Sequence, residues 1–253
     1  MALIVYGVMR ADDCPDGLDV ESRKQTIEVR SIAHDSVCAL VGDAPDNGPV
    51  RVRRSALLAH TDVLQAAMER GAVLPLRFGM VLPDEQAVRE ELLVPHSATY
   101  AARLEALAGC AEFQLKVTFD GERVLTSILT SDRSLSDAAA LVRSLPGEAG
   151  HFDRIRLGEL ISERVEGRAE NVAREIITTL EPLAVAVSRG PRQHEWMALN
   201  AAFLVEMQHR DAFDGAVDRL NEDHHGELQF RLLGPLPPHT FADHAWEAGA
   251  AWA

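Results

Sequence analysis

The clearest pattern in the chain is a strict alternation of apolar and polar residues over positions 112–119. A period of two places one set of side chains on a single face of a β-strand. The dipeptide Asp120-Gly121 follows directly and is typical of a hairpin turn, so residues 123–129 are predicted to return as a second strand beside the first. The apolar positions of the pattern are Phe113, Leu115, Val117 and Phe119.

In the first part of the chain, two apolar runs surround a polar region and lead into a helical pattern. Residues 2–9 and 36–41 are short apolar runs that predict buried strands, and residues 42–49 are rich in Asp, Gly and Pro and predict a loop. Over residues 52–70 apolar side chains recur every three or four positions, and Gly71 follows where a helix C-terminus is expected. This pattern predicts an amphipathic helix.

Two further helices are predicted before residue 109. Asp84, directly after a proline, is placed to cap the first of them, and Pro95 interrupts it. Tyr100 and Leu104 then continue at helical spacing. Residues 1–108 are therefore predicted to form an N-terminal domain of mixed strands and helices.

The second half of the chain predicts the order strand, helix, strand, strand, helix, strand. An extra helix is expected near residues 136–145. This order is that of a ferredoxin-like (βαββαβ) fold, so we predict an α+β protein with a ferredoxin-like domain at 109–253. After the strand at 112–119, the segments are a long helical stripe over 157–180, a strand at 183–187, an apolar run over 196–205, a short helix at 212–220 and a strand at 228–232.

The segment VLPLRFGMV, residues 73–81, places four unusual residues in apolar surroundings. Pro75 is expected on an edge strand and Gly79 at a bulge or tight bend, with Phe78 between them and Arg77. A buried Arg77 guanidinium needs a partner, which predicts a structural ion pair or, as the alternative, contact with a partner protein. The carboxylates considered for the ion pair are Glu85, Glu90 and Glu112.

The C-terminal segment predicts an extended exit from the last strand followed by a docked tail. Its closely spaced prolines exclude a helix there. The following residues, with Phe241 and Trp246, are predicted to form a short helix within the tail 234–253, docked on the C-terminal domain. The backbone residues expected to shape this exit are Gly234, Pro235, Pro237 and Pro238.

Composition and charge exclude several classes of function. The chain has 253 residues and a net charge of −14, which disfavours binding to nucleic acids or to anionic membranes. No apolar run approaches the roughly 20 residues of a membrane span. The three cysteines Cys14, Cys38 and Cys110 have no paired spacing, which argues against a disulfide framework and favours a reducing compartment.

Catalytic and cofactor motifs are absent from the sequence. There is no phosphate-binding glycine loop, dinucleotide fingerprint or nucleophile elbow. His194-Glu195 lacks the second histidine of a zinc protease, because Ala198 stands in its place. The histidines near His224 and His239 match no known ligand spacing and are interpreted as surface residues. We predict no enzyme activity, no metal and no cofactor.

Two other classes of protein share the predicted strand order. A small-molecule sensor or an enzyme would need a pocket with convergent polar groups, and no cluster in the sequence demands one. An RNA-recognition module would need exposed aromatic residues and a basic face, whereas Phe113, Phe119 and Phe230 are predicted to point into the core.

Ordered agreement along nearly the whole chain resembles the gas vesicle protein L/F family. The matching segments are the opening strand, the helix with His60, VLPLRFG, AGCAEFQLKV, EWMALNAAFLV and GPLPP. Leu236 and His239 stand where the family often has aromatic residues, and Met80 stands where threonine is common. These departures are expected to alter tail docking or partner choice without changing the fold.

The resemblance implies an accessory or minor structural protein of the gas vesicle in the cytoplasm. Its expected partners are the hydrophobic major gas vesicle shell protein and other gas vesicle accessory proteins. By shielding the apolar surface and strand edges of the shell protein, it would prevent aggregation during assembly. The alternative is a scaffold that links other accessory proteins.

Overall fold

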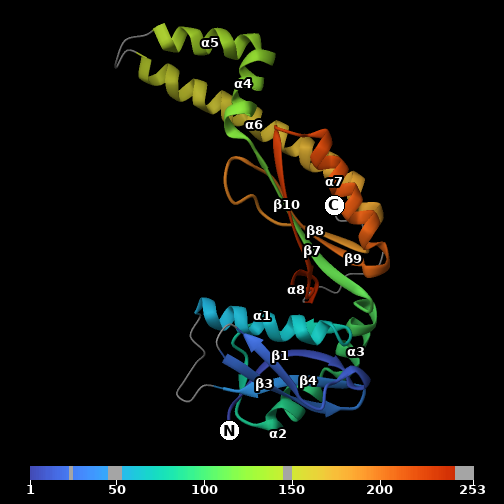
Figure 1. The fold of residues 1–253 in the computed structure, drawn as a ribbon. Coiled ribbons are helices and arrows are strands. Elements are labelled where there is room, and N and C mark those ends of the chain that lie inside the picture. The colour runs from blue at the N-terminus through green and yellow to red at the C-terminus, as the bar shows by residue number, and fades with distance from the viewer. Residues whose placement is uncertain (23–24, 45–52, 145–149, 243–253) are drawn as a thin grey trace. The chain divides into compact units, whose positions relative to one another are not determined.

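The computed structural model describes residues 1–22, 25–44, 53–144 and 150–242 (Figure 1). The chain forms two compact units. Unit 1 contains Met1–Glu112, Glu206–Gln208 and Gly234–Ala253, and unit 2 contains Phe113–Val205 and His209–Leu233. The end of the chain therefore returns to the unit in which the chain begins.

Unit 1 is built around a sheet with the order β2-β3-β4-β1-β5, in which β6 also pairs with β1. The pairs β1–β4, β1–β5, β2–β3 and β3–β4 are antiparallel. The predicted runs at 2–9 and 36–41 are β1 and β4, and their side chains are almost all buried. The strands are β1 Leu3–Arg10, β2 Leu18–Ser22, β3 Gln25–His34, β4 Val37–Asp43, β5 Val73–Pro75 and β6 Val81–Leu82.

Strands β2 and β3 were not predicted from the sequence, which indicated only a turn region near Asp12–Asp19. Their described side chains are partly exposed and strongly polar. Such strands lie at the side of a sheet, where the hydrophobic pattern is weak. Their pairing is set by contact with β4 rather than by local periodicity.

Helices cover both faces of this sheet (Figure 1). The predicted amphipathic helix is α1 Arg54–Met68, which contacts β1, β2, β3 and β5. On the other face lie α2 Glu85–Ala87, a π-helical turn Val88–Leu93 and α3 Ser97–Ala106. Asp84 caps α2 as predicted, because its Oδ1 accepts a hydrogen bond of 2.9 Å from the amide of Ala87.

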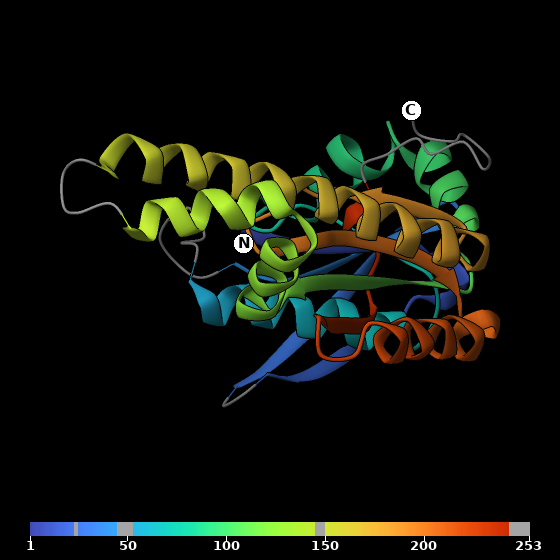
Figure 2. The same cartoon turned by 90° about the horizontal axis from the view of Figure 1, so that it is seen from above.

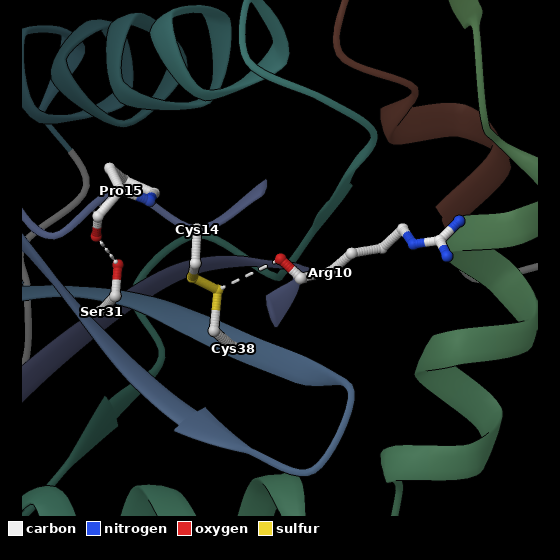
Figure 3. Close-up of a disulfide and its surroundings, with 5 residues drawn as sticks. All are labelled: Arg10, Cys14, Pro15, Ser31 and Cys38. Carbon is white, nitrogen blue, oxygen red and sulfur yellow. Dashed lines mark hydrogen bonds between the residues drawn. A yellow bond between two sulfur atoms is a disulfide. The ribbon is translucent and has the colours of Figure 1, made fainter. Parts of the chain in front are cut away.

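A disulfide joins Cys14 to Cys38 in unit 1, contrary to the prediction from the cysteine count (Figure 3). The pairing of β1 with β4 places Met9 opposite Cys38. The 3-10 turn Ala11–Asp13 then turns the chain and brings Cys14 to β4. The Sγ atom of Cys38 lies 3.8 Å from the carbonyl oxygen of Arg10. Cysteines far apart in sequence thus meet through strand pairing, which cysteine spacing alone does not reveal.

Unit 2 contains a four-stranded sheet with the order β10-β7-β9-β8. The alternating segment forms β7, and its apolar positions 113, 115, 117 and 119 are buried as predicted. Phe213 of α7 packs against Phe113 and Phe203, with ring centroids 5.5 Å and 5.3 Å apart. The elements are β7 Cys110–Phe119, β8 Ala186–Arg189, β9 Met197–Glu206, β10 Leu228–Leu236, α6 His151–Leu180 and α7 Arg210–Asp223.

The hairpin predicted at Asp120-Gly121 is wrong, because a helix follows β7. Asp120 accepts a hydrogen bond of 3.1 Å from the amide of Arg123 and caps α4 Gly121–Ser131. Val124 and Ile128, four residues apart, are buried on one side of this helix. The expected extra helix is α5 Arg133–Ser144, which lies beside α6 (Figures 1 and 2). Among the described helices, none is long and apolar enough to cross a membrane.

Candidate interaction site

The two segments that stood out in the sequence meet in unit 1. The first, VLPLRFGMV, forms β5 and the turn after it. The second continues β10 through Gly234 and Pro235 and then forms the short helix α8 His239–Ala242, which contacts β5. The predicted docking of the tail on the C-terminal domain is therefore wrong for the described part, since the tail from Gly234 onward belongs to unit 1.

A buried carboxylate holds α8 in place. Glu112 has no exposed surface, and its two oxygens accept hydrogen bonds from the backbone amide of Thr240 at 2.7 Å and from its hydroxyl at 2.8 Å. At the other end of α8, the Arg103 guanidinium donates a 2.9 Å bond to the carbonyl of Ala242. Phe241 is 4% exposed and anchors α8 in the core. Hydrogen bonds to a buried charged group are strong, so α8 is firmly docked.

The turn after β5 has the backbone features that its residues predicted. Pro75 ends β5 at the edge of the sheet, where it lacks no ladder hydrogen bond donor. Gly79 has a φ of 84°, a left-handed conformation that a side chain disfavours. The turn is bound to β1 by two 3.0 Å bonds, from the amide of Leu76 to the carbonyl of Tyr6 and from the amide of Val5 to the carbonyl of Met80.

Arg77 is exposed rather than buried. Within the part of the chain that the structure describes, its guanidinium forms none of the ion pairs predicted with Glu85, Glu90 or Glu112. The reason is that β5 ends at Pro75, so Arg77 lies on the turn and not inside the sheet. Glu112 instead binds Thr240.

Four aromatic rings from distant parts of the sequence surround His60 on α1. Its ring centroid lies 5.4 Å from that of Tyr6 on β1 and 5.5 Å from that of Phe78, which it meets edge to face. The ring of His239 at the start of α8 is 6.5 Å away. His60 thus connects α1, β1, the turn after β5 and the docked tail.

His60 is a buried, neutral histidine. Its side chain belongs to a residue that is 4% exposed, and neither ring nitrogen has a hydrogen-bond partner among the described residues. Burial, and secondarily the neighbouring charge of His239, lowers the pKa of His60 to about 4. The imidazole therefore offers one donor and one acceptor nitrogen at neutral pH.

An open pocket of about 440 Å³ lies beside His60 in unit 1. Tyr6, His60 and Phe78 contribute aromatic walls, and the carboxylates of Glu28 and Asp43 lie among its lining groups. Burial, with a smaller effect of the Asp43 charge, raises the pKa of Tyr6 to about 12, so the phenol stays protonated. A Cβ at Gly42 would approach the Tyr6 hydroxyl to 3.0 Å, so the space beside this ring requires glycine.

A second hollow, of about 830 Å³, lies between α4 and α6 in unit 2. Its charged groups are already paired with each other or with nearby groups. Arg164 binds Asp132 at 3.1 Å, and Arg192 binds Glu166 at 3.0 Å. Arg168 pairs with Glu227. This hollow therefore has fewer free polar groups than the pocket beside His60.

The remaining residues singled out in the sequence have separate positions. Gly234 and Pro235 are joined by a cis peptide bond near the end of β10, and Pro237 and Pro238 are buried between β10 and α8. Trp246 lies outside the described residues. No group of three or more His, Cys, Asp or Glu is arranged to hold a metal ion in the described ranges.

The sequence did not reveal the importance of Thr240 and Tyr6, nor the burial of Glu112. In the alternating strand β7, Glu112 falls on the polar side of the pattern, which predicts exposure. The only local signal was a carboxylate at the start of an otherwise apolar strand. Its partner Thr240 is 128 residues away, so the contact appears only in the folded chain.

Comparison with known proteins extends over nearly the whole chain. The family described as gas vesicle synthesis protein GvpL/GvpF matches residues 2–243. Gas vesicle protein F of Streptomyces sp. (strain CB03234) is 35% identical, covering 96% of this chain and 100% of that protein. Gas vesicle protein F2 of Halobacterium salinarum is 27% identical, covering 95% of this chain and 92% of that protein.

Solved structures agree with this relationship. The crystal structure of the gas vesicle protein GvpF from Anabaena sp. PCC7120 has a TM-score of 0.82 with 26% identity, covering 97% of this chain and 99% of that one. GvpF from Microcystis aeruginosa has a TM-score of 0.77 with 26% identity, over 96% and 99% of the two chains. Sequence and fold lead to the same assignment: the chain belongs to the GvpL/GvpF family of gas vesicle synthesis proteins.

Proposed function

We propose that this chain is a gas vesicle accessory or minor structural protein that binds the hydrophobic major shell protein and prevents its aggregation during assembly. It acts in the cytoplasm and at the gas vesicle, and it carries out no catalysis. The observation that carries this proposal is the family match over residues 2–243. Relatives of nearly equal length bear the names gas vesicle protein F and L.

Free sheet edges support a chaperone-like role. In unit 1, β5 contacts α8, whereas β2 forms the opposite edge of the sheet. In unit 2, β8 and β10 are the edge strands. An edge strand can pair with an extended segment of another protein through its main chain. A net charge of −14 would keep the resulting complex soluble.

The segments that meet near α8 are proposed to form part of the interaction surface. Arg77 is exposed and has no ion pair among the described residues, so it is available to a partner protein. Phe78 is partly buried beside it. The other residues would shape this surface through the backbone or by anchoring the tail: Pro75, Gly79, Gly234, Pro235, Pro237, Pro238 and Phe241.

The ferredoxin-like prediction for the C-terminal domain is also retained as a proposal. Its support is the order β10-β7-β9-β8, which numbered along the unit is 4-1-3-2. The helices α4 and α5 precede α6 between the first two strands and would be additions to that plan.

Co-expression tests the shell-binding proposal directly. The tagged chain and the major shell protein of the same organism are produced together, and the soluble shell protein is measured after centrifugation and affinity purification. We expect soluble shell protein that is recovered with the tag and stays bound at high salt, because an apolar interface is little screened. Loss of shell protein to the pellet, with or without this chain, would contradict the proposal.

Two matched variants locate the surface. Arg77→Ala is expected to reduce recovery of the shell protein, whereas Arg70→Ala, which alters another exposed arginine of unit 1, is expected to leave it unchanged. Equal recovery with both variants would remove Arg77 from the proposed surface. Recovery of other accessory proteins without the shell protein would instead support the scaffold alternative.

A further inference from the structure

The pocket beside His60 has a composition that none of the comparisons assigns to a ligand. It measures about 440 Å³, within the size range of sites that hold small ligands or side chains. Three elements of the sheet and helix α1 contribute to it, together with the turn after β5. All of these parts belong to unit 1.

The polar groups around this pocket can accept hydrogen bonds or attract positive charge. Glu28 is exposed on β3, and its carboxylate has no hydrogen bond or ion pair within the described chain. Asp43 is bound on one side by Arg30 at 2.6 Å. No described residue that lines the pocket is a lysine or arginine. The pocket therefore carries negative charge without a cation of its own.

The deepest polar group is His60, which is more than nine-tenths buried and lines the pocket. Both of its ring nitrogens lack a partner in the described structure. A buried polar group without a hydrogen bond is costly, so such a group points to a ligand that supplies one. The neutral imidazole can accept a hydrogen bond from a donor-rich ligand.

The aromatic walls select the kind of cation. Tyr6 and Phe78 flank His60, and their ring faces attract a cation placed over them. A guanidinium is planar, stacks on aromatic rings and binds a carboxylate with two parallel hydrogen bonds, whereas an ammonium group is a compact, strongly hydrated charge. The combination of ring faces, acceptors and free carboxylate matches a guanidinium.

We propose that this pocket binds an arginine side chain of a partner protein, with the guanidinium between Glu28 and the rings of Tyr6, His60 and Phe78. The proposal rests on the proposed function only in taking the partner to be another gas vesicle protein. The pocket is large enough for the arginine and parts of its neighbours in the partner sequence. Its chemistry differs from the apolar interface proposed for the shell protein and adds a specific anchor.

Binding of a short peptide to the full-length protein tests this proposal without any vesicle protein. The probe is acetyl-Ala-Arg-Ala-amide, and its matched control carries citrulline, which has nearly the same shape without the charge. Binding is followed by NMR through the ring signals of His60, identified by their loss in His60→Gln. We expect the arginine peptide to shift these signals, and the citrulline peptide to bind at least about tenfold more weakly.

Surface variants separate the pocket from the general negative charge of the protein. Glu28→Gln is expected to weaken arginine-peptide binding about two- to fivefold, as for an exposed ion pair. Glu91→Gln removes an exposed carboxylate outside the pocket and is expected to have no effect. Because both positions are exposed, both variants are expected to fold.

Several results would overturn the proposal. Equal binding of the arginine and citrulline peptides, no shift of the His60 signals, or equal effects of the two glutamate variants would each do so. Tighter binding of spermidine than of the peptide would assign the pocket to a small polyamine rather than a protein. None of these results affects the co-expression test, so the two proposals fail separately.

Discussion

Removal of one hydroxyl group should loosen the docked tail by an amount that the structure allows us to calculate. In Thr240→Ala, the backbone amide still donates to Glu112, but the 2.8 Å hydrogen bond from the side chain is lost. The acceptor is a fully buried carboxylate. A hydrogen bond to a charged group contributes about 1.5–3 kcal/mol. We therefore expect the free energy of local opening of α8 to fall by about 2 kcal/mol.

Hydrogen exchange measures this opening without requiring the whole protein to unfold. A loss of about 2 kcal/mol corresponds to an increase of about 30-fold in the exchange rates of the amides at positions 240–242, if exchange follows the population of the open state. Thr240→Ser keeps the hydroxyl and is the matched control, for which we expect rates within about threefold of the parent protein. Amides in the core of β7 should not change in either variant.

A double-mutant cycle distinguishes this bond from a general effect on packing. When Glu112 is already replaced by Ala, the change Thr240→Ala should have little further effect on exchange in α8. If Thr240→Ala and Thr240→Ser accelerate exchange equally, or if the two replacements simply add, the hydroxyl–carboxylate bond does not hold the tail. The reasoning from burial and distance would then be refuted.

Three other predictions concern the stability of unit 1. Because the pKa of His60 is lowered to about 4 in the folded protein, the unfolded chain binds a proton more readily below pH 6.5, and stability should fall by up to about 3 kcal/mol as the pH decreases from 6.5 to 4; urea unfolding should show this slope, and His60→Gln should lack it. Reduction of the Cys14–Cys38 disulfide, which spans 24 residues, should cost about 3 kcal/mol, whereas Cys110→Ser should leave the response to reductant unchanged in urea unfolding. Gly79→Ala should cost about 1 kcal/mol because its φ is 84°, and thermal unfolding that shows no loss would contradict the left-handed turn.

Local patterns in the sequence were sufficient for many elements of the fold. The alternation in β7 and the helical spacing in α1 and α6 were correctly predicted, because each buries one face and the period of its apolar residues matches its backbone geometry. Pro75 and Gly79 likewise indicated an edge and a tight turn. These features depend on a few neighbouring residues, which the sequence displays directly.

Where one local signal fits two structures, the sequence alone was ambiguous. Asp120-Gly121 suits a hairpin turn, but Asp120 is equally suited to cap a helix, and the helix α4 follows. The burial of Val124 and Ile128, which are four residues apart, decides between them. Tertiary packing thus selected the helix, since only that period places both side chains in the core.

The sequence by itself determined the family, the α+β composition and most of the strands and helices, because these depend on short-range periodicity and ordered motifs. Only the tertiary structure decided which distant residues meet. The disulfide, the burial of Glu112 against Thr240 and the pocket around His60 each join segments separated by many residues. Such contacts are set by strand pairing and by the return of the chain to unit 1. No local pattern encodes them, because their partners become neighbours only when the core has formed.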